Sequence, residues 1–266
     1  MLPIGRPFSP RPPILVIIVL LAGFGRTLAE ESWRDRRIAG PFVCQADFPL
    51  DDMEGLFDDL ARLQQDLVRH LGVRPAGETI ELYLFDDQGS YRRFLSRNYP
   101  QVPYRRALYV KTGGVGRVFA YRSRQFAVDI RHECTHALLH AALPMVPLWL
   151  DEGLAEYFEA PPSERGFDNP HLSPVRWNAR LRMPSSSLGK LETLDGIGGM
   201  GGSEYRNAWS WTHFMLHGPR EAHEELVGFL ADIQAQTPPG SLSNRLEHRL
   251  PNLERHFAAH FRSWKR

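Results

Sequence analysis

One stretch decides how this chain folds: residues 126–159 read FAVDIRHECTHALLHAALPMVPLWLDEGLAEYFE. Apolar residues recur through Phe126–Leu143 at the three- and four-residue spacing of a helix, and Trp149–Glu159 is predicted as a second helix. Neither Pro144 nor Pro147 can continue the first helix, so the two prolines make a tight connection. The stretch therefore predicts two buried helices that follow one another closely.

The sequence before this stretch mixes helical and strand patterns. Helices are predicted at Met53–Leu71 and Gly89–Asn98, and strands at Glu78–Phe85, Arg106–Val110 and Arg117–Tyr121. Asp51 or Asp52 can cap the first helix, and Gly72 ends it. The glycine-rich segment 111–116 joins the last two strands as a hairpin. We expect the strand Arg117–Tyr121 to be able to pair with an extended peptide, as edge strands do.

The sequence after it is rich in Pro, Ser and Gly and then becomes helical. Residues 161–203 are predicted as a loop region, with one helical turn near Leu188–Leu194. Helices follow at Tyr205–Leu216, Glu221–Gln236 and Leu242–Phe261, with a break at Pro251. The expected fold is α+β: a small mixed sheet beside the helix of residues 126–143, and a mostly helical C-terminal part.

The N-terminus predicts export. Arg6 and Arg11 precede an apolar run, Ile14–Phe24, which is short for a transmembrane helix, and Thr27-Leu28-Ala29 resembles a cleavage site. We expect residues 1–29 to be a signal peptide or, alternatively, an uncleaved N-terminal membrane anchor. The other expected regions are an α/β part at 30–160, the loop region at 161–203 and the helical part at 204–266. The protein would then be periplasmic or secreted, or attached to the membrane by its N-terminus.

Composition gives no sign of a nucleic-acid partner or of a fold held together by disulfide bonds. The 266 residues carry a formal net charge of +1, which gives no signal for nucleic acid. The two cysteines, Cys44 and Cys134, are too few for a disulfide framework, and Cys134 is expected to be a small core residue. A bridge between them is the less favoured alternative.

The chemistry centres on the motif His132-Glu133-Cys134-Thr135-His136. Residues four apart stand on one face of a helix, so His132 and His136 can bind one zinc ion. Glu133 can then act as general base on a water molecule at that ion. A catalytic zinc needs a third protein ligand, and His140 is too far along the helix to converge with the other two.

The segment Trp149-Leu150-Asp151-Glu152-Gly153-Leu154-Ala155 makes the pattern more specific. A histidine motif followed by such a helix resembles the gluzincin zinc metallopeptidases, and most of all the peptidase-MA-like bacterial domains. The resemblance covers residues 117–160 best and implies Glu152 as the third zinc ligand. It also implies that Gly153 lets the two helices approach closely. The connection from His136 to Glu152 is shorter than in the large aminopeptidases, so their substrate features do not carry over.

The resemblance also implies supporting residues. In thermolysin-like relatives an acid one turn beyond the glutamate ligand orients the first histidine, which assigns Glu156 to His132, with Asp151 as the competing choice. Related peptidases place an oxyanion donor downstream of the glutamate helix, which points to Tyr205, with His213 as the alternative.

The expected function is zinc-dependent hydrolysis of peptide bonds in a peptide or protein substrate. A non-catalytic zinc-binding module of an envelope assembly, built on a peptidase fold, is the rival, and amide cleavage in cell-wall material is a third possibility because it shares the same zinc chemistry.

Overall fold

The computed structural model describes residues 33–265 apart from 184–186 and 195. The predicted signal segment, residues 1–29, lies outside the described residues. Within the described part, no helix combines the length and the apolar character needed to cross a bilayer.

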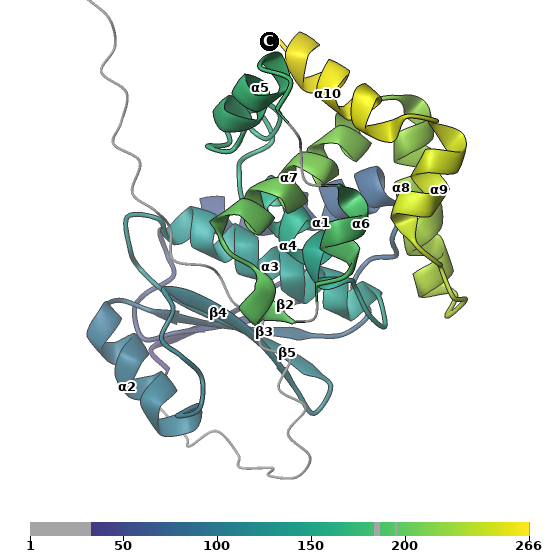
Figure 1. Cartoon of the computed structure of the whole chain (residues 1–266). Coiled ribbons are helices and arrows are strands. Elements are labelled where there is room, and N and C mark those ends of the chain that lie inside the picture. The colour runs from purple at the N-terminus through teal and green to yellow at the C-terminus, as the bar shows by residue number, and fades with distance from the viewer. Residues whose placement is uncertain (1–32, 184–186, 195, 266) are drawn as a thin grey trace, which may run out of the picture.

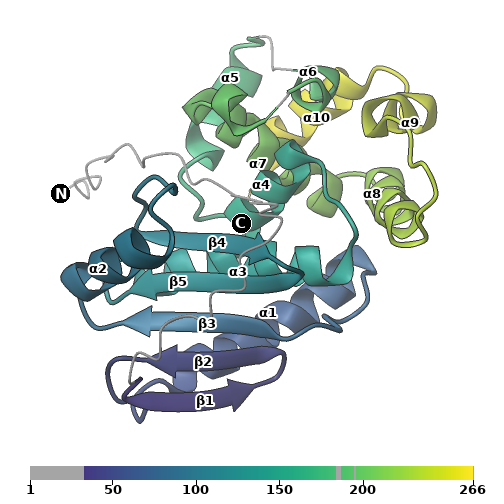
Figure 2. The same ribbon diagram turned by 90° about the horizontal axis from the view of Figure 1, so that it is seen from below.

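Five strands form one mixed sheet in the order β1-β2-β3-β5-β4 (Figures 1 and 2). They are β1 Asp35–Ala39, β2 Phe42–Ala46, β3 Ile80–Phe85, β4 Ala107–Thr112 and β5 Val115–Tyr121. The central strands β2, β3 and β5 are parallel, and β1 and β4 pair antiparallel at the two edges. The three predicted strands are present, whereas the β1–β2 hairpin, which turns at Gly40 with φ of 57°, lies in a segment for which no strand was predicted.

The β4–β5 hairpin confirms the glycine-rich turn but corrects one expectation. Gly113 and Gly114 both have positive φ, as the tight turn requires. Because Val118 of β5 pairs with Leu82 of β3 and with Tyr109 of β4, Arg117–Tyr121 is an interior strand and cannot accept a peptide. The edge on this side of the sheet is β4.

Strand alternation divides the sheet into two packed faces. On β3, Leu82 and Leu84 join the main core with α1 (Glu54–Leu71) and α3 (Phe126–Ala142). Tyr83 and Phe85 pack on the other face with α2 (Gln88–Asn98). Helix α1 ends at Gly72 with φ of 67°, as predicted, but Met53 stands at its N-cap with no side-chain hydrogen bond, so the prediction of an aspartate cap is wrong.

The C-terminal part is helical and lies against α3 (Figure 1). Its helices are α4 Leu148–Phe158, α5 Leu172–Arg180, α6 Leu188–Glu192, α7 Gly202–His217, α8 Arg220–Gln234, α9 Leu242–Arg249 and α10 Leu253–Ser263. Helix α5 occupies part of the segment that was predicted as loop. Helix α4 packs against α3 on one side and most extensively against α7 on the other. The described part is thus an α+β fold with a five-stranded mixed sheet and ten helices.

Candidate metal centre

Helices α3 and α4 bring two histidines and a glutamate together. His132 and His136 lie one turn apart on α3, and Glu152 comes from the first half of α4, after the linker 143–147 with its two prolines. All three side chains have no exposed surface. The structure therefore places the three ligands expected from the sequence in one buried cluster.

Close contact between α4 and α7 fixes the position of Glu152. A Cβ atom on the next residue, Gly153, would lie 2.5 Å from Thr212 Oγ1 and 2.6 Å from the Ala208 carbonyl oxygen. Only glycine fits there. The close approach is to α7, not to α3, which corrects the expectation from the sequence.

The distances within the cluster suit one small cation. His132 Nε2 lies 3.1 Å from His136 Nε2, and Glu152 Oε2 lies 3.7 Å and 3.8 Å from these two nitrogens. A tetrahedral ion with bonds of about 2.1 Å separates its ligand atoms by about 3.4 Å. The three atoms can therefore be three corners of such a site.

Two further carboxylates set the orientation of the imidazoles. His132 Nδ1 lies 3.0 Å from Glu159 Oε2, and His136 Nδ1 lies 2.9 Å from Asp151 Oδ1, a contact off the line of an ideal hydrogen bond. A carboxylate at Nδ1 favours the tautomer with the proton on Nδ1, which leaves the lone pair on Nε2. Two Nε2 lone pairs 3.1 Å apart repel each other unless a positive charge lies between them.

The charges around the imidazoles favour such a positive charge. Burial by itself lowers the pKa of His132, but the nearby carboxylates of Glu152 and Glu159 reverse the effect and raise the pKa well above its usual value. Burial likewise lowers the pKa of His136, and Asp151 raises it beyond that loss. The surroundings of both rings therefore stabilise a cation.

Unsatisfied buried oxygens provide the test of whether a metal fits. Both carboxylate oxygens of Glu152 and one of Glu133 are buried with no hydrogen-bond partner among the described residues. A buried carboxylate without a partner costs several kcal/mol. A metal bound by Glu152 and the two histidines would offset this cost at Glu152, so the residues present fit the group that the motif implies.

Glu133 lies beside the ligands and has the acidity of a general base. Its side chain is 1% exposed, and burial raises its pKa to about 7 against the lowering influence of His132 and His136. A carboxyl group with a pKa near neutrality can accept a proton and then return it.

Glu159 is the carboxylate within hydrogen-bonding distance of His132 Nδ1. Glu156, the residue expected there, lies 3.3 Å from His171 Nε2 and also forms a group with His132 and Glu159 whose ligand atoms lie within 4.8 Å of one another. Seven residues are almost two full turns, so Glu159 follows Glu152 on one face of α4 and reaches the first histidine. Asp151, the competing choice for His132, instead contacts His136.

His140 belongs to the same network as a supporting residue. Its Nε2 lies 2.9 Å from Asp151 Oδ2, so one carboxylate joins His136 and His140. The sequence argument leaves His140 out of the ligand set, and here its Nε2 contacts the Asp151 carboxylate. Cys134 is buried and free, as is Cys44, so no bridge forms between them.

The two proposed oxyanion donors have different surroundings. Tyr205, near the start of α7, is 5% exposed, and its pKa is raised by burial first and then by the charges of Glu152 and Glu156. Tyr205 thus lies within electrostatic reach of the cluster. His213, two turns further along α7, contacts His260 Nε2 and the Gly166 carbonyl oxygen through its two ring nitrogens, so it is not available as a donor.

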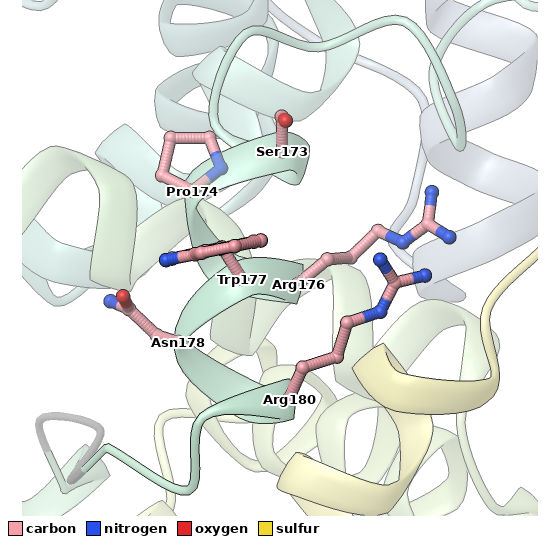
Figure 3. A pocket seen from close by; sticks show the side chains of 6 residues that line it. All are labelled: Ser173, Pro174, Arg176, Trp177, Asn178 and Arg180. Carbon is pink, nitrogen blue, oxygen red and sulfur yellow. The ribbon is translucent and has the colours of Figure 1, made fainter.

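One surface hollow is separate from this cluster. Its volume is about 430 Å³, and it follows α5, where Arg176 and Arg180 extend to the same side of the helix (Figure 3). Its lining includes none of the cluster residues. The side chains of the three expected ligands themselves have no exposed surface.

Comparisons with known proteins do not identify a family for this chain. No protein-family model matches the sequence, and no curated protein matches it. Among solved structures, the M1 zinc metallopeptidase from Deinococcus radiodurans is similar with a TM-score of 0.37 and 13% identity, over 88% of this chain. This chain spans 52% of that chain, and a TM-score this low supports no conclusion about function.

Proposed function

We propose that this chain is an exported zinc metallopeptidase. One observation carries the proposal: the two Nε2 atoms and Glu152 Oε2 lie within 3.8 Å of one another, with carboxylates behind both histidines. Nitrogen and oxygen ligands in a tetrahedral arrangement suit zinc, and three protein ligands leave the fourth position for chemistry. The apolar run at residues 14–24 supports export.

The residues of this chain then have separate roles. His132, His136 and Glu152 would hold the metal, which when bound lowers the pKa of a water molecule to about 7. Glu133 accepts a proton as the water attacks the carbonyl carbon, and donates it to the leaving nitrogen. Tyr205 donates a hydrogen bond to the developing oxyanion. Glu159 and Asp151 hold the imidazoles in place.

Metal analysis and peptide digestion together test this proposal. The purified full chain should contain about one zinc per molecule, and it should cleave members of a proteome-derived peptide library in a chelator-sensitive way. Glu133→Gln should keep its zinc and lose about 100-fold or more in turnover. Tyr205→Phe should keep zinc and lose turnover selectively. A zinc-containing protein that cleaves no peptide would contradict the proposed activity.

A non-catalytic zinc-binding module of the cell envelope is the second proposal. The observation that favours it is the packing of the cluster in the interior, where all three ligand side chains have no exposed surface. Under this alternative Glu133→Gln would leave the biological role unchanged.

A further inference from the structure

Residues 88–128 carry positive charge only. This segment forms α2, β4, β5 and their connections, and it holds nine Lys and Arg residues but no Asp or Glu. Four of the cations pair with acids outside the segment, in the pairs Arg106–Asp129, Lys111–Glu78, Arg117–Glu81 and Arg122–Asp86. A fifth cation, Arg92, stacks over the Tyr104 ring.

Arg105 is the cation of this segment with the least satisfied surroundings. Its side chain is half-buried, and its Nε is buried with no hydrogen-bond partner among the described residues. No carboxylate of the described part lies within ion-pair distance of it, and the neighbouring Arg106 adds a like charge. A guanidinium in this position is costly unless it binds an anion.

Contacts of the two residues that flank Arg105 hold the loop 104–106 against helix α3, which carries the two histidines and Glu133. Arg106 donates two hydrogen bonds to Asp129, of 2.8 Å and 3.1 Å, and Asp129 lies one turn before Glu133 on α3. Tyr104 packs edge-on against Tyr91, with ring centroids 6.2 Å apart. These two contacts fix the loop between α2 and the first turn of α3, one helical turn before Glu133.

Two charge effects relate this loop to Glu133 and Tyr205. Burial raises the pKa of Tyr205, and the positive charge of Arg105 opposes that rise. Burial also raises the pKa of Tyr91, and the charge of Glu133 adds to the rise. Arg105 is therefore within electrostatic range of Tyr205, and Tyr91, which packs against Tyr104, is within electrostatic range of Glu133.

We propose that Arg105 binds a carboxylate of the substrate at the edge of the metal centre, so that the preferred substrates are peptides with an acidic group near the cleaved bond. The inference rests on the proposed peptidase function. Guanidinium and carboxylate form paired, parallel hydrogen bonds, which give orientation as well as affinity. The carboxylate comes either from an Asp or Glu side chain or from the C-terminus of the peptide.

Binding to a variant that cannot turn over the substrate tests this directly. The zinc-loaded full chain with Glu133→Gln is titrated with alanine- and serine-based decapeptides that carry an uncharged fluorophore. The peptides contain no Asp or one Asp at each position in turn, and each has a free or an amidated C-terminus. We expect the best acidic peptide to bind at least about tenfold more tightly than its neutral analogue. The position series and the amidated set identify the source of the carboxylate.

Three double variants, each with one further substitution added to Glu133→Gln, test whether the preference depends on Arg105. Arg105→Gln should remove the preference for the acidic peptide and leave binding of the neutral one within about twofold. Arg105→Lys should keep part of the preference. Arg124→Gln, which removes an exposed cation of the same segment, should keep all of it. Zinc content and circular dichroism verify that each variant is folded.

The outcomes separate this inference from the proposed function. A preference that survives Arg105→Gln, or equal binding of acidic and neutral peptides, would overturn the role of Arg105. Digestion of the same peptides by the unsubstituted protein tests the peptidase activity separately. Cleavage without charge preference would reject the inference alone, whereas an Arg105-dependent preference without cleavage would reject the activity alone.

Discussion

Glu159 Oε2 lies 3.0 Å from His132 Nδ1, so the carboxylate that orients the first ligand comes from the residue that follows helix α4. The Glu159 carboxyl group is almost completely buried, and its backbone oxygen accepts a hydrogen bond of 2.6 Å from Arg131 Nε. The end of α4 is thus held against α3 by two contacts with adjacent residues, and the metal site depends on both helices keeping this register.

We expect Glu159→Gln to weaken zinc binding about 10- to 100-fold. The neutral amide removes the negative charge beside His132 Nδ1, which favours the tautomer with the proton on Nδ1 and the lone pair on Nε2. Competition with a chromophoric chelator measures the affinity. Glu156→Gln, one turn earlier and beside His171, is the matched control and should change the affinity by less. The opposite order of the two effects would show that Glu156 has the orienting role.

Local signals explain which parts of this fold could be predicted. Helical periodicity, two prolines and a pair of glycines predict α3, α4 and the β4–β5 hairpin, because each signal acts within a few residues. Helix α5 was missed because Pro174 suggests a loop, although proline is tolerated in a first helical turn. Its apolar residues Leu172, Val175 and Ala179 keep helical spacing and could have revealed it.

For the candidate site too, features that depend on local spacing could be predicted, and features that depend on how the helices pack could not. Spacing along α3 predicts that His132 and His136 share a face, but it does not predict which carboxylate reaches each Nδ1. That choice depends on how α4 crosses α3, and hence on packing against α7. The two-turn spacing from Glu152 to Glu159 is the sequence signal that could have favoured Glu159 over Glu156.

Gly153→Ala should destabilise the protein by about 2 kcal/mol or more, because its Cβ would lie 2.6 Å from the Ala208 carbonyl oxygen, which cannot move without displacing α7. Urea unfolding measures the loss. Gly55→Ala is the control: this helical glycine has nothing within 4 Å of its added Cβ, so the substitution should be neutral or stabilise by about 0.5–1 kcal/mol. Equal stability of the two variants would show that α4 and α7 are farther apart at Gly153 than this structure places them.

Glu152→Gln should have opposite effects with and without metal. In the metal-free protein it should increase the free energy of unfolding by about 1 kcal/mol or more. Burial raises the pKa of Glu152 in spite of His132 and His136 at 3.7 Å and 3.8 Å, so its carboxylate costs more to bury than these contacts return, and a neutral amide avoids that cost. In zinc-loaded protein it should decrease that free energy, since an amide oxygen is the weaker ligand. Urea unfolding in chelator and in zinc measures both, with the exposed Glu164→Gln as the unchanged control. A loss of stability in both states would show that Glu152 is satisfied by the protein alone.

A separate group of histidines predicts how stability depends on pH. Burial lowers the pKa of His213 to about 3, of His217 to about 4 and of His260 to about 4. Their ring nitrogens contact one another, the Tyr157 hydroxyl and the Gly166 carbonyl oxygen. His70 and His223 lower the pKa of His217 further, and no carboxylate contributes to any of the three shifts.

The sign of the effect follows from which state binds more protons. Between pH 6.5 and about 4 the unfolded chain binds protons at these histidines and the folded protein does not, so the free energy of unfolding falls as the pH falls. Each group should contribute more than about 1 kcal/mol over this window.

Urea unfolding at pH 7 and at pH 4.5 measures how much stability is lost on acidification. Because carboxylates at the metal centre add to the same acid loss, only the difference between variants reports on this group. His260→Gln can keep the contact to His213 without the titration and should reduce the loss, whereas the exposed His248→Asn should leave it unchanged. An equal acid loss in both variants would mean that these buried rings do not control the acid sensitivity of the fold.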